Sequence, residues 1–139
     1  MVLPENIQDL IDDFAFLDDW EERYMHVIDM GKQMPPLAAE ERNEITRVKG
    51  CVSQVWLVSK FDPETHLLSF RGESDAHIVK GLVAIVLTLF SDRTPEEILA
   101  IDAEPILSQL GLSEHLSIQR SNGLRAMIDR IKAEARSHI

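Results

Sequence analysis

Apolar positions at a helical spacing open the chain. They recur at intervals of three and four residues, which predicts an amphipathic helix over 5–16; they are Ile7, Leu10, Ile11 and Phe14. A second helix is predicted over 19–30, with Asp18 as its N-cap and Gly31 as a left-handed terminator. A short acidic stretch, 38–42, is predicted to form one further turn. The first third of the chain is therefore expected to be helical.

The period changes after Cys51. Residues 52–60 are rich in β-branched and aromatic types and predict a strand, which a turn over 62–65 joins to a second, antiparallel strand over 66–72. The segment before Gly50 is a candidate for a third strand. A short antiparallel sheet is therefore expected in the middle of the chain.

The remaining residues return to a helical pattern. Residues 76–90 are apolar on nearly every side, which predicts a buried central helix capped by Ser74 or Asp75. Four further elements are predicted after it: helices over 95–100 and 104–110, one turn near 113, and a last helix from about Ser121. This order of elements, helices followed by a hairpin and then by more helices, predicts an α+β fold. We expect one compact domain over 1–139, with the sheet packed against several helices.

Charge narrows the range of partners. The chain has 14 basic and 24 acidic residues and a formal net charge of −10. Such a surface repels phosphate, so neither nucleic acid nor an anionic membrane is expected as a partner. The first residues lack the features of a signal peptide, and the apolar run 81–90 is shorter than the roughly 20 residues that span a bilayer. A single cysteine cannot form an internal disulfide, and a cytoplasmic location is expected.

Cys51 is the candidate chemical group. It follows Gly50, which favours a sharp loop that presents the thiol, with nearby amides available to stabilise a thiolate; the alternative is a small buried apolar residue. One cysteine provides neither several thiolate ligands nor a Cys-x-x-Cys pair. The histidines show no context typical of a catalytic base or of a metal site; they are His26, His66, His77, His115 and His138. Two readings stay open: a thiol that accepts and passes on a group, or one without chemistry.

Several blocks of the sequence resemble the SufE family of sulfur-acceptor proteins. The similarity lies in the run from Arg47 to Trp56 around Cys51, in 20–24, in 28–31 with Pro35, in 74–76, in 78–82 and in 120–124. These blocks occur in the family's order and cover most of the chain. The resemblance implies a SufE/IscU-like fold and a role in sulfur relay.

In that family, a pyridoxal-phosphate-dependent cysteine desulfurase, of the SufS or CsdA type, is the sulfur donor. The resemblance implies that Cys51 attacks the donor's persulfide, carries the sulfur, stimulates the desulfurase and delivers the sulfur to an iron–sulfur scaffold complex. It implies no cofactor in this chain, because pyridoxal phosphate belongs to the desulfurase. No metal is expected either, and no turnover of a small molecule by the chain alone. Val52, Val55 and the central helix are expected to shield the persulfide, and the loop is expected to swing out on docking.

The resemblance also places Arg120 near the cysteine loop, where a guanidinium can stabilise a thiolate or persulfide; a salt bridge or a helix-start hydrogen bond is the alternative. Asp75 is expected to act as a helix cap, and Ser53 and Gln54 to hydrogen-bond the loop. Trp20 and Trp56 are expected in the core.

Two other functions stay open at this level. One is an interaction module that binds and regulates a desulfurase without transferring sulfur. The other is a thiol-dependent enzyme such as a peroxidase, although the chain has no second, resolving cysteine.

Overall fold

An antiparallel hairpin forms the sheet in the computed structural model, which describes residues 3–51 and 53–139. Strands β1 (Val55–Asp62) and β2 (Leu67–Ser74) pair along their whole length. His66 closes the turn with φ of 63°, and its N–H donates to the carbonyl of Asp62 at 2.7 Å. The predicted hairpin is confirmed, with both strands displaced by one to three residues along the chain. Val52, which began the predicted first strand, lies outside the described residues.

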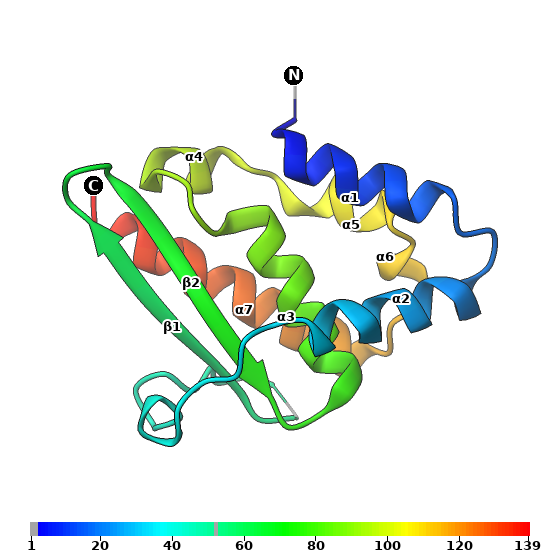
Figure 1. The fold of residues 1–139 in the computed structure, drawn as a ribbon, viewed down its shortest axis with the longest axis horizontal. Helices are drawn as coiled ribbons and strands as arrows, with labels where there is room; N and C mark the ends of the chain where they lie inside the picture. Colours follow the sequence, from blue (N-terminus) through cyan, green and yellow to red (C-terminus); the bar gives the residue numbers. More distant parts are fainter. Residues whose placement is uncertain (1–2, 52) are drawn as a thin grey trace.

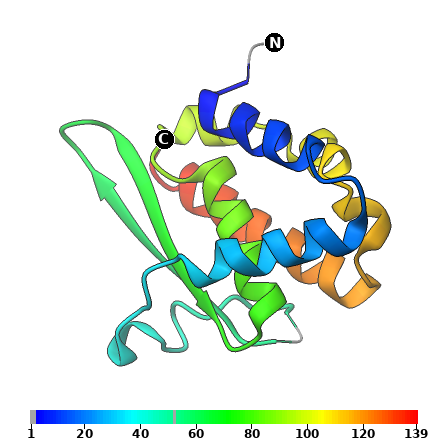
Figure 2. The same ribbon diagram turned by 45° about the vertical axis from the view of Figure 1, so that its right-hand side comes forward.

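Helices precede and follow the hairpin, as predicted. Before it come α1 (Glu5–Ala15), α2 (Trp20–Lys32) and one 3-10 turn, η1 (Ala39–Glu41). In the described part of the chain, five helices follow it: α3 (His77–Phe90), α4 (Pro95–Ala100), α5 (Ala103–Gln109), α6 (Leu112–His115) and α7 (Ile118–Arg136). The hairpin stands to one side and the helices pack on the other (Figures 1 and 2). The predicted α+β class, with a short antiparallel sheet against several helices, is confirmed.

Helix α3 lies at the centre of this arrangement (Figure 1). It contacts α1, α2, α7 and β2. Ten of its 14 residues are buried, which confirms the prediction of a central helix that is apolar on nearly all sides. None of the helices in the described segments 3–51 and 53–139 is long and apolar enough to cross a bilayer.

Two glycines bring α2 and α3 into backbone contact. A Cβ added at Gly81 would lie 2.1 Å from the carbonyl oxygen of Val27, and one at Gly31 would lie 2.6 Å from the backbone nitrogen of Gly81. The prediction that Gly31 terminates the helix is wrong, because α2 continues to Lys32 and Gly31 is buried within it. The absence of a side chain at Gly31 serves close packing and not a turn.

Two helices begin at residues other than those predicted. Asp19, not Asp18, caps α2, and its carboxylate accepts the N–H of the third helical residue at 2.8 Å. Adjacent aspartates offer the same capping chemistry, so only the position at which the backbone becomes extended decides between them. Ser117, not Ser121, caps α7. The first turn of α7 was missed because its residues are exposed and therefore lack an inward apolar stripe.

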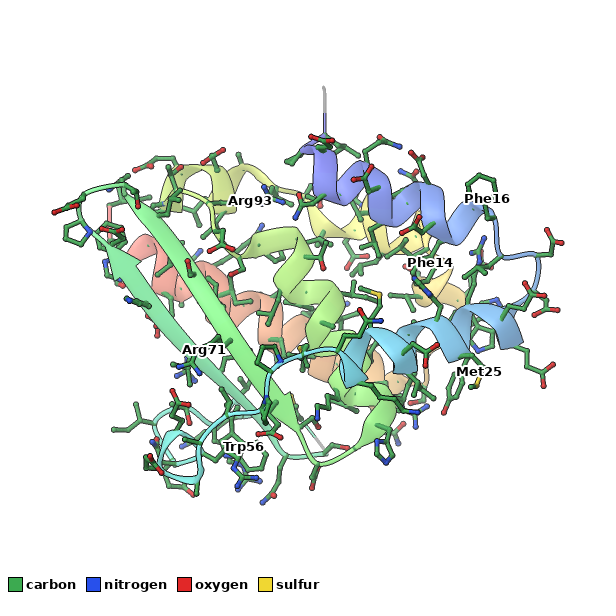
Figure 3. All side chains as sticks on the ribbon, in the orientation of Figure 1. Phe14, Phe16, Met25, Trp56, Arg71 and Arg93 are labelled. Carbon is green, nitrogen blue, oxygen red and sulfur yellow. The ribbon has the colours of Figure 1, made fainter. Side chains whose placement is uncertain are left out.

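Buried Arg93 joins the end of α3 to α1 (Figure 3). Its guanidinium donates to the carbonyls of Leu89 and Thr88 at 2.7 and 3.1 Å and to the side-chain oxygen of Asn6 at 2.7 Å. The cation therefore satisfies carbonyls that the end of a helix leaves unpaired.

We expect Gly81→Ala to lower the free energy of unfolding by about 2 kcal/mol or more, as overpacking in a core does. The added methyl group would overlap the backbone of α2, and the two helices must separate to admit it. Urea unfolding followed by circular dichroism measures the change.

Gly123→Ala in α7 is the matched control. Gly123 is also helical and buried, but a Cβ there would meet no atom nearer than 3.5 Å. Its free energy of unfolding should stay unchanged or rise by up to about 1 kcal/mol, since alanine favours a helix over glycine. Equal destabilisation of both variants would contradict the close α2–α3 contact.

Candidate functional site: a thiol at a cavity between the cysteine loop, α3 and α7

Cys51 lies in a short loop that leads into β1. The N–H of Val48 donates to the carbonyl of Val55 at 2.8 Å and closes the loop around residues 49–54. Gly50 has φ of 96°, which places it in the left-handed region and confirms the sharp turn predicted there. The hydrogen bonds at its base fix the position at which the thiol is presented.

The predicted third strand before Gly50 is reduced to one bridge. Arg47 pairs with Trp56 of β1 as an isolated antiparallel bridge, and the sheet in the described part of the chain has two strands. The chain turns at Gly50, three residues after Arg47, so the pairing does not extend into a longer ladder.

Asp75 anchors the other side of the loop. Its carboxylate accepts the N–H of Gln54 at 3.0 Å, and its own N–H donates to the carbonyl of Gln54 at 3.3 Å. The prediction that Ser74 or Asp75 caps α3 by its side chain is wrong, because the N-cap is Ala76, which has no side-chain cap bond. The hairpin brings the Gln54 N–H, 21 residues away, within reach of the carboxylate. Gln54 thus joins the network through its backbone.

The thiol of Cys51 rests against α7. It is half-buried, and its sulfur lies 3.6 Å from the carbonyl oxygen of Gly123, to which the S–H donates. A Cβ at Gly123 would lie 3.5 Å from that sulfur, so the missing side chain leaves space directly beside it. Burial raises the pKa of the Cys51 thiol above its ordinary value. The resting group is therefore held as the neutral thiol.

A cavity of about 490 Å³ opens beside this thiol. Three segments line it: the loop with Cys51 and Ser53, α3 with Val79 and Leu82, and the start of α7 with Ser117, Gln119, Arg120, Gly123 and Met127. Part of its wall is apolar, and α3 contributes to it as expected. Val55 instead is fully buried in the core and is not among the described residues that line the cavity. Val52 lies outside the described residues.

Arg120 shares this cavity with Cys51, although 69 positions separate them in the sequence. Its backbone N–H donates to the hydroxyl of Ser117, which is the expected helix-start bond. Its side chain is exposed and forms no ion pair within 4 Å among residues 3–51 and 53–139. The guanidinium remains available to an anion at the cavity.

Sequence reasoning did not place Gly123 or Met127 at the site. Gly123 is 72 positions from Cys51, and Met127 belongs to the inner stripe of α7. Their contact with the site follows from the packing of α7, which no local pattern reveals.

The histidines lie elsewhere, and none is among the described residues that line the cavity. Two of them stack on aromatic rings with centroid distances of 4.4 Å, His115 on Trp20 and His138 on Phe61. Trp20 is half-buried and packs on the core, as predicted. The prediction that Trp56 lies in the core is wrong, because it is only half-buried and is not among the described residues that pack on the core. The guanidinium of Arg42 lies 5.9 Å from the centre of its ring. In the described part of the chain, no three His, Cys, Asp or Glu side chains are grouped as metal ligands.

The fold and this site define an α+β protein that presents one thiol at the edge of a cavity. The SufE family model, described as an Fe-S metabolism associated domain, matches residues 8–135. An uncharacterized SufE-like protein of Rhizobium etli is 56% identical over 133 residues, covering 94% of this chain and 90% of the relative. Another from Rhizobium meliloti is 54% identical over 136 residues, covering 96% and 97%. The chain belongs to the SufE family, and its association is with iron–sulfur metabolism.

A solved structure shows the same fold. The solution structure of a hypothetical protein from Thermus thermophilus matches with a TM-score of 0.78 at 19% identity, covering 99% of this chain and 98% of that one.

We expect iodoacetamide to alkylate Cys51 several-fold more slowly in the folded protein than in the urea-unfolded chain at pH 7.5, because only the thiolate reacts. The raised pKa means that the folded state favours the protonated thiol. The stabilisation of the folded state by this effect is fully present below the pKa of the cysteine in the unfolded chain. It is lost as the pH rises through the pKa of the cysteine in the folded protein. The alkylation rate of the folded protein should therefore still be rising at a pH where that of the unfolded chain has levelled off.

Intact-protein mass spectrometry against pH measures this rate, and Cys51→Ser reports labelling elsewhere. A folded-state midpoint at or below that of the unfolded chain would contradict the burial effect.

Proposed function

We propose that this protein is a sulfur acceptor: it takes persulfide sulfur from a pyridoxal-phosphate-dependent cysteine desulfurase onto Cys51. The observation that carries the proposal is the Cys51 thiol at the edge of a cavity, in a loop that turns at Gly50. Membership of the SufE family and its association with iron–sulfur metabolism supply the context.

The transfer step balances without an added oxidant. The Cys51 thiolate attacks the outer sulfur of the desulfurase persulfide, a new S–S bond forms to Cys51, and the donor's S–S bond breaks. The donor cysteine leaves as a thiolate, and the proton of the persulfide stays with the transferred sulfur. Repetition of the step toward a thiolate of the recipient returns Cys51 to its starting state.

The cavity fits the needs of a carrier. A persulfide is easily reduced, and the apolar side chains of Val79, Leu82 and Met127 limit the access of water-borne reductants. At the same cavity, Arg120 supplies a fixed positive charge that favours an anionic persulfide. The protein itself needs only its side chains for this step; pyridoxal phosphate belongs to the donor, and an iron–sulfur scaffold complex is the recipient.

The resting thiol is not the reactive form. Burial raises its pKa and its S–H is directed to the carbonyl of Gly123. Docking must therefore move the loop away from α7, and Gly50 is the position at which the backbone can turn without a steric penalty. The hydrogen bonds between Asp75 and Gln54 hold the base of the loop while its tip moves.

The same resting thiol favours a second candidate function. A cysteine held neutral against a helix is also what a non-transferring module would show, if it bound and regulated a desulfurase through the loop surface alone. The two functions differ in whether sulfur reaches Cys51.

Incubation with a cysteine desulfurase, pyridoxal phosphate and free cysteine, without reductant, should add sulfur to the intact protein. The mass should rise by about 32 Da, one sulfur, since the outer sulfur is transferred whole. Cys51→Ser should show no addition and no stimulation of the desulfurase.

A relocated thiol is the matched control. Cys51→Ser combined with Thr65→Cys keeps one thiol but places it on the exposed turn of the hairpin. This variant should acquire little sulfur, because its thiol lacks the loop and the cavity. Equal loading would mean that any exposed thiol suffices, and stimulation by Cys51→Ser would support the regulatory module instead.

Binding of the desulfurase should speed the alkylation of Cys51 at least several-fold, because the loop leaves α7. The measurement uses a desulfurase whose own active-site cysteine is replaced by alanine, so that only the acceptor is labelled. Unchanged alkylation in a bound complex would contradict the opening of the loop.

A further inference from the structure

The surface next to Cys51 has the opposite charge character from the protein as a whole. A second hollow, of about 610 Å³, is lined by Ile45, Arg47, Lys49, Ala126 and Arg130, together with Val48, Glu44 and Asp129. Taken with Arg120 at the cavity, the two hollows have four basic and two acidic lining residues. The whole chain has 14 basic and 24 acidic residues, so this is a local reversal.

The two hollows flank the cysteine loop. Lys49 lines one and Cys51 the other, with Gly50 between them. On α7, Gly123 lines the first and Ala126, one turn later, the second; Ala126 is also the side chain that faces Gly50. A partner that reaches the thiol therefore approaches both hollows at once.

Exposed apolar side chains accompany the basic ones. Ile45 in the second hollow is 83% exposed, and Ile118, between two residues that line the cavity, is 78% exposed. They are two of the five large apolar side chains that are exposed in the described part of the chain. Such residues provide the apolar contacts of an interface, around which charges set orientation.

The second hollow is held in place before any partner arrives. The guanidinium of Arg130 donates to the carbonyls of Ile45 and Arg47 at 2.6 and 3.2 Å and so fixes this segment to α7. Arg47, Lys49 and Arg120 form no ion pair within 4 Å among residues 3–51 and 53–139. Their charges are thus not neutralised within the described chain.

The far end of the molecule is acidic. Figure 3 places Phe16 and Met25 at the end away from Trp56, which follows the cysteine loop. The hollow at that end is lined by Leu17, Asp19, Glu21, Glu22, Met25, His26 and Asp29, with four carboxylates and no lysine or arginine among the described residues. Arg47, which pairs with Trp56, lies at the opposite end from these carboxylates (Figure 3), whereas the start of α7 is nearer to them, because His115 stacks on Trp20. The separation between Arg47 and the carboxylates orients the molecule in the field of a charged partner.

We propose that the surface formed by Ile45, Arg47, Lys49, Ile118 and Arg120 is the docking surface for the desulfurase, and that the desulfurase meets it with an acidic rim around apolar residues. This inference rests on the proposed function and adds the chemistry of the partner. A net charge of −10 would slow the approach of an acidic protein, and the basic side chains oppose that repulsion only in the orientation that brings Cys51 to the donor.

The test is the charge reversal Arg47→Glu with Lys49→Glu, in the Cys51→Ser background so that binding is separated from transfer. The partners are the desulfurases of the mass-spectrometric experiment. At about 50 mM NaCl the dissociation constant should rise about tenfold or more, and at about 500 mM NaCl the difference should largely disappear, because salt screens the charges. The single variant Lys49→Glu should show the same trend. Because Lys49 is exposed, this variant still tests the proposal if the double variant is unstable.

Lys32→Glu with Lys60→Glu is the matched control. Both lysines are exposed, lie outside the two hollows and give the same change in net charge. Their dissociation constant should stay within about twofold of that of the background. An equal loss of affinity in this control would show that net charge alone matters and would overturn the proposed surface.

The outcomes separate this inference from the proposed function. Charge-dependent binding without sulfur on Cys51 would support the docking surface and overturn the carrier. Sulfur loading at rates indifferent to salt and to the reversal would overturn the docking surface and keep the carrier. Absence of binding to the desulfurases would overturn both.

Two small disulfides test the local charge without a protein partner. The dianionic 5,5′-dithiobis(2-nitrobenzoate) and the neutral 4,4′-dithiodipyridine each form a mixed disulfide with the Cys51 thiolate and release an aromatic thiolate. The rate with the dianionic reagent, divided by the rate with the neutral one, should fall several-fold in Arg47→Glu with Lys49→Glu. In the lysine control this ratio should stay unchanged. An unchanged ratio in the first variant would contradict a basic surface at the thiol.

Discussion

The close packing of α3 against its neighbours is the constraint on which the rest of the structure depends. At Gly81 the backbones of α2 and α3 touch, and at Gly72 strand β2 approaches α3 so closely that a Cβ would lie 2.6 Å from Val83. These contacts fix a helix and the hairpin on two sides of α3. Because Val79 and Leu82 of α3 form part of the cavity wall, the same packing sets the surroundings of Cys51.

The site is assembled from segments far apart in the chain. The loop that carries Cys51 is held at its base by Asp75, from the connection between β2 and α3, and the thiol itself rests on Gly123 of α7. Each contact opposes a different movement: the carboxylate holds the backbone at Gln54, whereas the weak sulfur–carbonyl bond holds only the tip. A loop bound in this way is firm at its base and easily released at its end, which suits the proposed carrier, whose thiol meets a donor and a recipient in turn.

Burial and charge act on this thiol in opposite directions. Burial favours the neutral form, whereas Arg120, Arg47 and Lys49 place uncompensated positive charge around the two hollows. Burial is the effect that acts on the resting thiol. With the proposed opening of the loop, the desolvation cost would disappear and the basic surroundings would favour the thiolate. In the proposed carrier, reactivity is thereby linked to docking, and the thiol is protected from unproductive oxidation while no partner is bound.

The sequence by itself determined the elements and singled out Cys51 as the candidate residue. Period and turn residues are local properties, so the hairpin, the buried helix α3 and the left-handed Gly50 could all be predicted, as could the family from its ordered motifs. Tertiary structure decided what those residues touch. Asp75 binds the loop instead of capping α3, Gly31 packs against Gly81 instead of ending α2, and Gly123 supports the thiol. In each case an aspartate or glycine suits several local roles, and the choice depends on a backbone group that only the folded chain brings within a few ångströms.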